Sequence, residues 1–154
     1  MTITDLLSLD RVVHEPVAGD KRAVFEALGA RLAPAAHAYR ADILACLASR
    51  ERLGSTGLGR GVAIPHGRLA GLSRPVGVMM KLAHGVEFDA PDGKPVDILF
   101  ALLVPMESTQ THLELLAQLA ELFADGHMLA ELRATGSPTE TLALLNRQVA
   151  AHAA

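Results

Sequence analysis

The chain has 154 residues, half of them apolar and 3% aromatic, which fits one domain with a core built mainly from Leu, Val, Ala and Ile. The formal charge of −3 argues against nucleic acid as the main partner, and a single cysteine excludes an internal disulfide. No stretch approaches the roughly 18 apolar residues of a membrane span, so we expect a cytoplasmic protein without direct membrane insertion.

The N-terminal part of the chain predicts a short helix, a strand and a longer helix. Residues 4–9 favour a short helix, and residues 11–13 favour a strand that ends at Pro16. A longer helix is expected to begin after Asp20, a suitable N-cap, because apolar residues then recur at helical spacing. Pro34 interrupts that pattern and is expected to end the helix.

A second helix is predicted over residues 39–53, and such helices are expected to cover a sheet. Its inward-facing apolar residues are Ile43, Leu44 and Leu47. Cys46 lies in the same apolar pattern, which indicates a buried helix residue rather than a reactive thiol. Arg50 belongs to an Arg-Glu-Arg cluster near the helix end, where solvation at the surface is the ordinary role of an arginine.

A glycine-rich loop follows over residues 54–61, and it matches neither nucleotide-binding motif. Arg60 stands where a Walker A loop needs lysine, and the glycines are spaced Gly-x-Gly-x-Gly rather than Gly-x-Gly-x-x-Gly. The loop still offers the hydroxyls of Ser55 and Thr56, together with backbone amides that could approach an anion. The pattern leaves two roles open, a plain connection and the rim of an anion site.

An apolar strand-like run then stops at Pro65 and presents His66, followed by Gly67. Proline has no amide hydrogen, so the strand is expected to end where His66 begins, and Gly67 is expected to leave one flank of the imidazole open. A neutral imidazole has a lone pair that can attack an electrophile, and Arg68 and Arg60 could attract an anion. These residues suggest a phosphoryl acceptor, although a histidine in this position is often an ordinary loop residue.

The rest of the chain predicts two further strands and three helices. We expect strands over 75–82 and 96–104, with a hairpin turn at Asp92-Gly93 between them. The first of the three helices is expected from 111 to Asp125-Gly126, and the other two over 127–133 and 138–149, the last one capped by Ser137. Together the elements predict an α/β domain in three layers, with a mixed sheet between helices.

Two other histidines have neighbours that suggest chemistry. Thr111 and Glu114 have capping-box spacing, which places His112 in the first turn of a helix. The field of a helix N-terminus favours anions and lowers the pKa of an imidazole, so a neutral His112 could donate to a phosphate oxygen. His84 lies near several carboxylates, but without the tight spacing of a zinc site, so a solvated loop is the expectation and a metal the weaker alternative.

Several separated motifs resemble, in order, the IIA domains of the fructose and mannitol branch of the bacterial phosphotransferase system. Within this branch the chain is most similar to the nitrogen-regulatory IIA proteins (PtsN, or IIA-Ntr). The resemblance covers most of the chain and is carried by four segments: Glu51-Arg52-Leu53-Gly54-Ser55-Thr56-Gly57-Leu58-Gly59, Gly61-Val62-Ala63-Ile64-Pro65-His66-Gly67-Arg68, Val96 to Pro105, and Thr111-His112-Leu113.

The resemblance implies a single type-2 IIA domain over 1–154 and a role for three of its residues. His66 matches the histidine that the family phosphorylates on Nε2, and His112 matches a second histidine that lies beside it. Arg50 matches an arginine that lines the phosphorylation site. Ser55, Thr56, Gly67 and Arg68 would complete the phosphate-binding surroundings, with no cofactor and no metal.

The resemblance also implies partners. The expected donor is an HPr-like phosphohistidine carrier, NPr, supplied from phosphoenolpyruvate by an upstream enzyme. The phosphorylation state is then expected to regulate other proteins, such as potassium-transport regulators or sensor kinases. Two alternatives stay open: a standalone sugar-transport IIA component that passes phosphate to a IIB partner, and a binding module of the same fold that performs no chemistry.

Overall fold

The computed structural model describes residues 1–15 and 19–153. Two 3-10 turns, η1 (Ile3–Leu6) and η2 (Leu9–Arg11), precede the first strand, β1 (Val12–Glu15), in place of the expected short helix. Pro16, expected to end this strand, lies outside the described residues. The remaining elements are α1 (Lys21–Ala36), α2 (Arg40–Arg52), β2 (Gly57–Gly59), β3 (Val62–Ala63), β4 (His66–Leu69), β5 (Val76–Val86), β6 (Val96–Pro105), α3 (Thr109–Phe123), α4 (Gly126–Ala134) and α5 (Pro138–Ala153).

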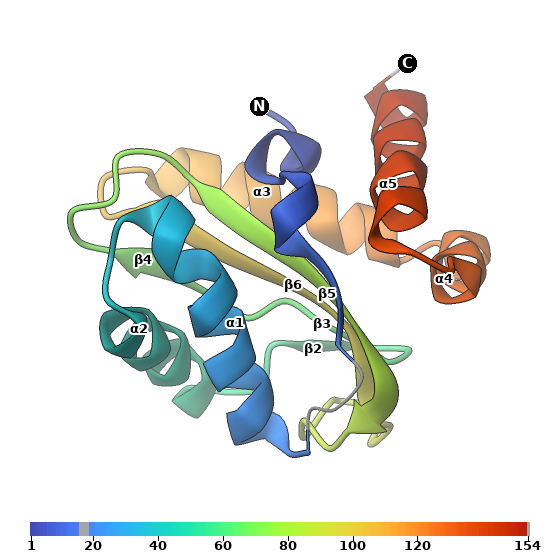
Figure 1. The fold of residues 1–154 in the computed structure, drawn as a ribbon, viewed down its shortest axis with the longest axis horizontal. Coiled ribbons are helices and arrows are strands. Elements are labelled where there is room, and N and C mark those ends of the chain that lie inside the picture. The colour runs from blue at the N-terminus through green and yellow to red at the C-terminus, as the bar shows by residue number, and fades with distance from the viewer. Residues whose placement is uncertain (16–18, 154) are drawn as a thin grey trace.

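The expected three-layer α/β fold with a mixed sheet is confirmed (Figure 1). The strands follow the order β1-β5-β6-β3-β2, and β4 also pairs with β6. Strands β5 and β6 are antiparallel, whereas β1 runs parallel to β5 and both β3 and β4 run parallel to β6. Strands β5 and β6 form the predicted hairpin, but its turn lies one residue earlier than predicted, with Pro91 and Asp92 at its centre, since the amide of Gly93 donates to the carbonyl of Ala90 over 2.9 Å.

Alternation along β6 separates two hydrophobic cores. Leu99, Ala101 and Leu103 pack with α1 and α2 on one face of the sheet. Ile98, Phe100 and Leu102 pack with η1, α3, α4 and α5 on the other face. Because successive side chains of a strand point to opposite faces, this continuous apolar strand supplies both cores. Among the helices that the structure describes, none combines the length and the apolar composition of a membrane span.

Two predicted boundaries on α1 and α3 were wrong. Pro34 does not end α1, which continues to Ala36 and closes at His37 in the left-handed conformation with φ 51°. Proline removes one hydrogen bond of a helix, and here it lies only three residues before the C-cap His37, in the last turn of α1. Helix α3 begins after Ser108 rather than at Thr111, so the capping-box prediction was also wrong, and His112 is its fourth residue.

Candidate active site

The strand that precedes His66, β3, ends before Pro65 as predicted, but a further strand that was not predicted begins at His66. His66 is the first residue of β4, which pairs with β6 in the register His66 to Leu102. Pro65 cannot donate to a sheet, but its carbonyl accepts from the amide of Leu102 over 2.9 Å. The proline therefore separates β3 from β4, while both strands stay paired with β6. This pairing fixes the backbone on both sides of the imidazole.

The imidazole of His66 is held in one tautomer by the backbone. Nδ1 lies 2.7 Å from the carbonyl oxygen of Ile64. Because a carbonyl only accepts, Nδ1 must carry the proton, and Nε2 of the neutral ring keeps its lone pair. His66 is only 8% exposed, and this burial is the main cause of its lowered pKa. The positive charge of Arg50 lowers the pKa further. The hydrogen bond from Nδ1 and the charge of Glu51 oppose the shift.

His112 lies beside His66, as the resemblance implied. The two ring centroids are 5.3 Å apart, and the rings meet edge to face at 69°. Burial lowers the pKa of His112 most, and the charges of His66 and Arg68 lower it further. In the part of the chain that the structure describes, Nε2 of His112 is the one buried side-chain nitrogen or oxygen without a hydrogen-bond partner. A buried polar atom of this kind normally has a partner, so Nε2 of His112 keeps its capacity for one hydrogen bond.

Three arginines named in the sequence analysis take different places. Arg50, in the last turn of α2, donates to the carbonyl of Gly54 over 2.8 Å, and its charge acts on His66. Arg68 lies two residues after His66 on β4, donates to Thr109 Oγ1 over 3.1 Å and acts on His112. Arg60 lies elsewhere, since its guanidinium contacts the carbonyl of Ala124 after α3. The structure therefore brings Arg50 and Arg68 to the two histidines and not Arg60.

The hydroxyls of the glycine-rich loop are engaged inside the protein. Ser55 donates to the carbonyl of Phe88 over 2.7 Å, and Thr56 donates to the carboxylate of Glu51 over 2.6 Å. In this arrangement neither hydroxyl is free to donate to an anion, contrary to the expectation of a phosphate-binding rim. Their hydrogen bonds instead hold the loop onto neighbouring segments.

Gly67 faces α2 rather than opening a flank of the imidazole. A Cβ atom built at this position would lie 2.5 Å from Sγ of Cys46, so the expectation of an open flank was wrong. Residues 66 and 67 of β4 point to opposite faces of the sheet, which turns Gly67 toward α2 while His66 meets α3. Cys46 is partly buried, its thiol donates to the carbonyl of Arg68 over 3.2 Å, and burial raises its pKa.

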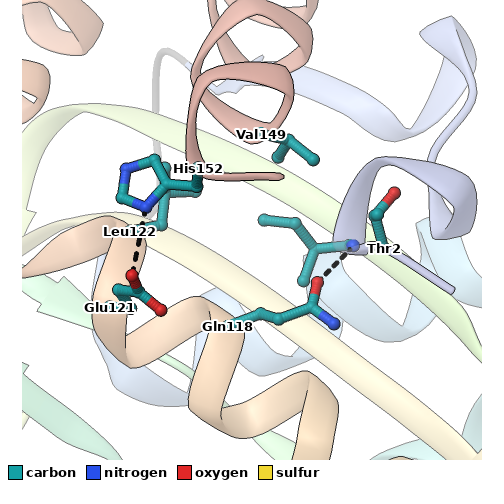
Figure 2. Close-up of a pocket in the computed structure, with 7 residues that line it drawn as sticks. Thr2, Gln118, Glu121, Leu122, Val149 and His152 are labelled. Atoms are coloured by element: carbon teal, nitrogen blue, oxygen red, sulfur yellow. Dashed lines mark hydrogen bonds and ion pairs between the residues drawn. The ribbon is translucent and has the colours of Figure 1, made fainter. Parts of the chain in front are cut away.

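A hollow of about 230 Å³ lies apart from these histidines, between the N-terminal turn, α3 and α5 (Figure 2). There the amide of Ile3 donates to the side-chain oxygen of Gln118, and Oε1 of Glu121 lies 3.3 Å from Nδ1 of His152. None of its lining residues belongs to the predicted site.

Within the described residues no group of three or more His, Cys, Asp or Glu is arranged to hold a metal ion, including the residues near His84.

The geometry at His66 agrees with a family match over nearly the whole chain. Residues 5–148 match the family described as the phosphoenolpyruvate-dependent sugar phosphotransferase system, EIIA 2. The chain belongs to this EIIA 2 family. It is a homologue of the nitrogen regulatory IIA proteins within the family.

Relatives and solved structures of EIIA 2 proteins support this placement. A nitrogen regulatory protein of Pseudomonas aeruginosa is 40% identical over 132 residues, which cover 85% of this chain and 86% of that protein. The crystal structure of the nitrogen regulatory protein IIA-Ntr from Neisseria meningitidis superposes with a TM-score of 0.88 at 44% identity, over 93% of this chain and 98% of that chain. The mannitol enzyme IIA of Escherichia coli, solved in complex with phosphorylated enzyme IIB, shares the fold, with a TM-score of 0.74 at 19% identity over 91% of this chain and 96% of that chain.

Two contributions to the site were absent from the sequence analysis. The carbonyl of Ile64 sets the tautomer of His66, and no side-chain pattern indicates a role for a backbone carbonyl. Glu51 binds the loop through Thr56, although it was recognised as part of the family motif without a role of its own. Its position directly after Arg50, in an Arg-Glu-Arg run, is typical of a solvated surface.

Proposed function

We propose that this protein is a phosphoryl carrier that accepts phosphate on Nε2 of His66 and regulates other proteins according to its phosphorylation state. The observation that supports this most is the hydrogen bond from Nδ1 of His66 to the carbonyl of Ile64, because it leaves Nε2 as the free nucleophile. The lowered pKa of His66 acts in the same direction, since it keeps the ring neutral near pH 7.

The proposed step moves one phosphoryl group between two imidazoles. Nε2 of His66 attacks the phosphorus of a phosphohistidine carrier in line, so a new N–P bond forms as the carrier's N–P bond breaks. The electron pair of the broken bond stays on the carrier's nitrogen, and the carrier ring, which is protonated on its other nitrogen, leaves as a neutral imidazole. No proton needs to move, because Nδ1 of His66 is already protonated and the Ile64 carbonyl stabilises the charge that develops on the ring.

His112 and Arg50 are proposed to stabilise the transferred group. A neutral His112 with its proton on Nε2 would donate to a phosphoryl oxygen, which would give this buried nitrogen the partner it lacks. Arg50 supplies positive charge near His66, and Arg68 supplies it next to His112. Both effects act on charge that spreads over the phosphoryl oxygens during transfer.

The donor is proposed to be an HPr-like carrier protein, NPr, and the surface near the site supports a protein partner. Leu53 follows α2 shortly after Arg50 and is 85% exposed, and Leu113 follows His112 and is 58% exposed. Large exposed apolar side chains near a reactive group are typical of a surface that docks another protein. The sugar-transport alternative, in which phosphate passes on to a IIB partner, would use the same surface.

The test is phosphorylation of the purified protein followed by intact-mass measurement. The protein is incubated with phosphoenolpyruvate, the upstream enzyme and NPr, and we expect the mass of one phosphate to be added. His66→Ala should remain folded and gain none, His112→Ala should gain it more slowly, and the exposed His84→Ala should behave as wild type. Labelling of His66→Ala at the wild-type rate would show that another histidine is the acceptor.

Two further outcomes separate the alternatives. A wild-type protein that gains no mass, under conditions that phosphorylate a control IIA protein, would favour the binding module without chemistry. Phosphate that passes from this protein to an added IIB protein would favour the sugar-transport role. Pull-downs with the phosphorylated and unmodified protein would identify the regulated proteins, for which potassium-transport regulators and sensor kinases are the proposed candidates.

A further inference from the structure

A buried carboxylate, that of Glu51, lies behind the glycine-rich loop in the last turn of α2. Its side chain is 7% exposed. Thr56 donates to it twice, from its backbone amide to Oε2 over 2.8 Å and from its hydroxyl to Oε1 over 2.6 Å. Lys21 adds a positive charge at 3.8 Å, and its ammonium group lies over the ring of Phe88. A buried carboxylate needs such donors, so this one is bound firmly to the loop.

Hydrogen bonds connect this carboxylate to the imidazole of His66 through two backbone carbonyls. The carbonyl of Thr56 accepts from the amide of Ile64 over 3.0 Å. The carbonyl of Ile64 then accepts from Nδ1 of His66 over 2.7 Å. Thr56 thus binds Glu51 through its amide and hydroxyl and Ile64 through its carbonyl. The direction of the Ile64 carbonyl therefore depends on where the loop is held.

The same helix end holds this loop at a second point. Arg50 donates to the carbonyl of Gly54 over 2.8 Å, two residues before Thr56. Adjacent residues of α2, Arg50 and Glu51, therefore fix the loop from Gly54 to Thr56 against the end of the helix. Arg50 and Glu51 both act on His66 by their charges, and Glu51 is in addition connected to His66 through these hydrogen bonds.

We propose that Glu51 is a positioning residue for His66. By holding Thr56 it places the Ile64 carbonyl so that the proton of His66 stays on Nδ1 and the lone pair stays on Nε2. This inference rests on the proposed phosphoryl transfer for its consequence, but the tautomer of His66 is measurable without any transfer. A purely structural role for Glu51 would change stability and leave the tautomer unchanged.

The test compares Glu51→Gln with Glu26→Gln in full-length protein carrying ¹⁵N-labelled histidine. Glutamine keeps the length but has one accepting oxygen and no charge, so the amide and the hydroxyl of Thr56 would have to share that oxygen in place of the two carboxylate oxygens that they contact now. Glu26 is an exposed residue of α1 paired with Arg22, so its substitution makes the same change in charge away from the loop. NMR of the ring nitrogens gives the tautomer of His66, and rapid-quench kinetics with phosphorylated NPr give the transfer rate.

We expect Nδ1–H to predominate in wild type and Glu26→Gln, and the Nε2–H tautomer to increase several-fold in Glu51→Gln. The maximal transfer rate of Glu51→Gln should fall roughly ten-fold, since misplacement of a reacting group slows its reaction. Its half-saturating NPr concentration should stay within about two-fold of wild type, because the loop residues concerned are inside the protein. An unchanged tautomer ratio in folded Glu51→Gln would overturn the proposal.

A second pair of variants keeps the test decisive if Glu51→Gln does not fold. Thr56→Val removes one donor to the carboxylate and keeps both backbone hydrogen bonds, whereas Thr56→Ser retains the hydroxyl. We expect a smaller shift toward Nε2–H in Thr56→Val and a wild-type ratio in Thr56→Ser. With Glu51→Gln unfolded, a wild-type ratio in Thr56→Val would overturn the proposal. Failure of wild type to accept phosphate would instead contradict the proposed function, and the tautomer ratios would still report on Glu51.

Discussion

The contribution of His112 to the free energy of unfolding changes with pH in a defined direction. The pKa of His112 is lowered, first by burial and then by the charges of His66 and Arg68. The folded state therefore binds its proton at a lower pH than the unfolded state, in which histidine titrates near about 6.5. As pH falls below that value, the unfolded state gains protons first, so the free energy of unfolding decreases until pH passes below the folded pKa.

This shift predicts that His112→Gln reduces the loss of stability on acidification. Urea unfolding at pH 8 and at pH 5.5 should show a smaller difference in free energy for His112→Gln than for wild type, because glutamine does not titrate. The exposed His84 provides the control, and His84→Gln should keep the wild-type difference. Equal pH dependence in wild type and His112→Gln would contradict the lowered pKa of His112.

Some of the individual site residues could be predicted from sequence, and others could not. His66 stands out because a proline, a glycine and an arginine surround it, and the family resemblance implied its neighbour His112. Their contact joins residues 46 positions apart, and local spacing carries no information on it. Glu51 was missed as a functional residue because burial of a charged side chain depends on tertiary packing, and its local sequence is typical of solvent-exposed helix ends.

At the scale of elements, the contact between β4 and α2 has no room for a side chain at Gly67. A Cβ atom there would lie 2.5 Å from Cys46 Sγ and 3.3 Å from the Cys46 carbonyl oxygen. Gly67→Ala is therefore expected to lower the free energy of unfolding by about 1–3 kcal/mol. Gly126→Ala, at the start of α4, is the matched control, because a Cβ atom added there would meet nothing within 4 Å.

A double-mutant cycle tests whether the sulfur causes this loss. Cys46→Ala removes Sγ, so it should recover about 1 kcal/mol of the cost of Gly67→Ala, measured by urea unfolding. Additive effects of the two substitutions would show that the collision with Sγ is not the cause. The remaining cost reflects the carbonyl oxygen of Cys46, which belongs to the backbone and cannot be removed by substitution.

Long elements followed their sequence patterns more closely than short ones. Strand β6 and helices α2 and α5 lie where their apolar patterns placed them, although their ends shift by a few residues. Strand β4 was missed because its four residues include a glycine and an arginine, and its pairing with β6 is a long-range interaction. Thr111 resembled an N-cap, but Ser108 occupies that position, and local spacing does not distinguish the two residues.

At the scale of the whole molecule, β5 and β6 connect the two cores, so the layers are expected to unfold together. Ile98 and Leu99 are adjacent on β6, fully buried, and point to opposite cores. Ile98→Ala and Leu99→Ala should each lower the free energy of unfolding by about 2–5 kcal/mol. Hydrogen exchange followed by mass spectrometry should show α1 and α5 losing protection together in both variants. Loss of protection confined to one layer would show that the cores unfold independently.

The layer arrangement was predictable from sequence, whereas the order of the strands was not. Alternating helical and extended segments indicate an α/β domain, because each apolar face must be covered by another element. Strand order depends on which segments pair at long range, and a short run of sequence pattern does not specify a neighbour. The sheet order and the place of β4 beside β6 therefore came only from the structure.

The carbonyl that orients His66 belongs to the main chain, whereas the side chain of Ile64 belongs to the core that η1, α3, α4 and α5 cover. The hydrogen bond made by the carbonyl and the packing of the side chain can therefore change independently of each other. Exchange of Ile64 for another branched aliphatic residue would change packing and leave the oxygen available to the imidazole. The hydrogen bond to His66 can thus tolerate changes of the side chain at residue 64, provided that the path of the backbone is kept.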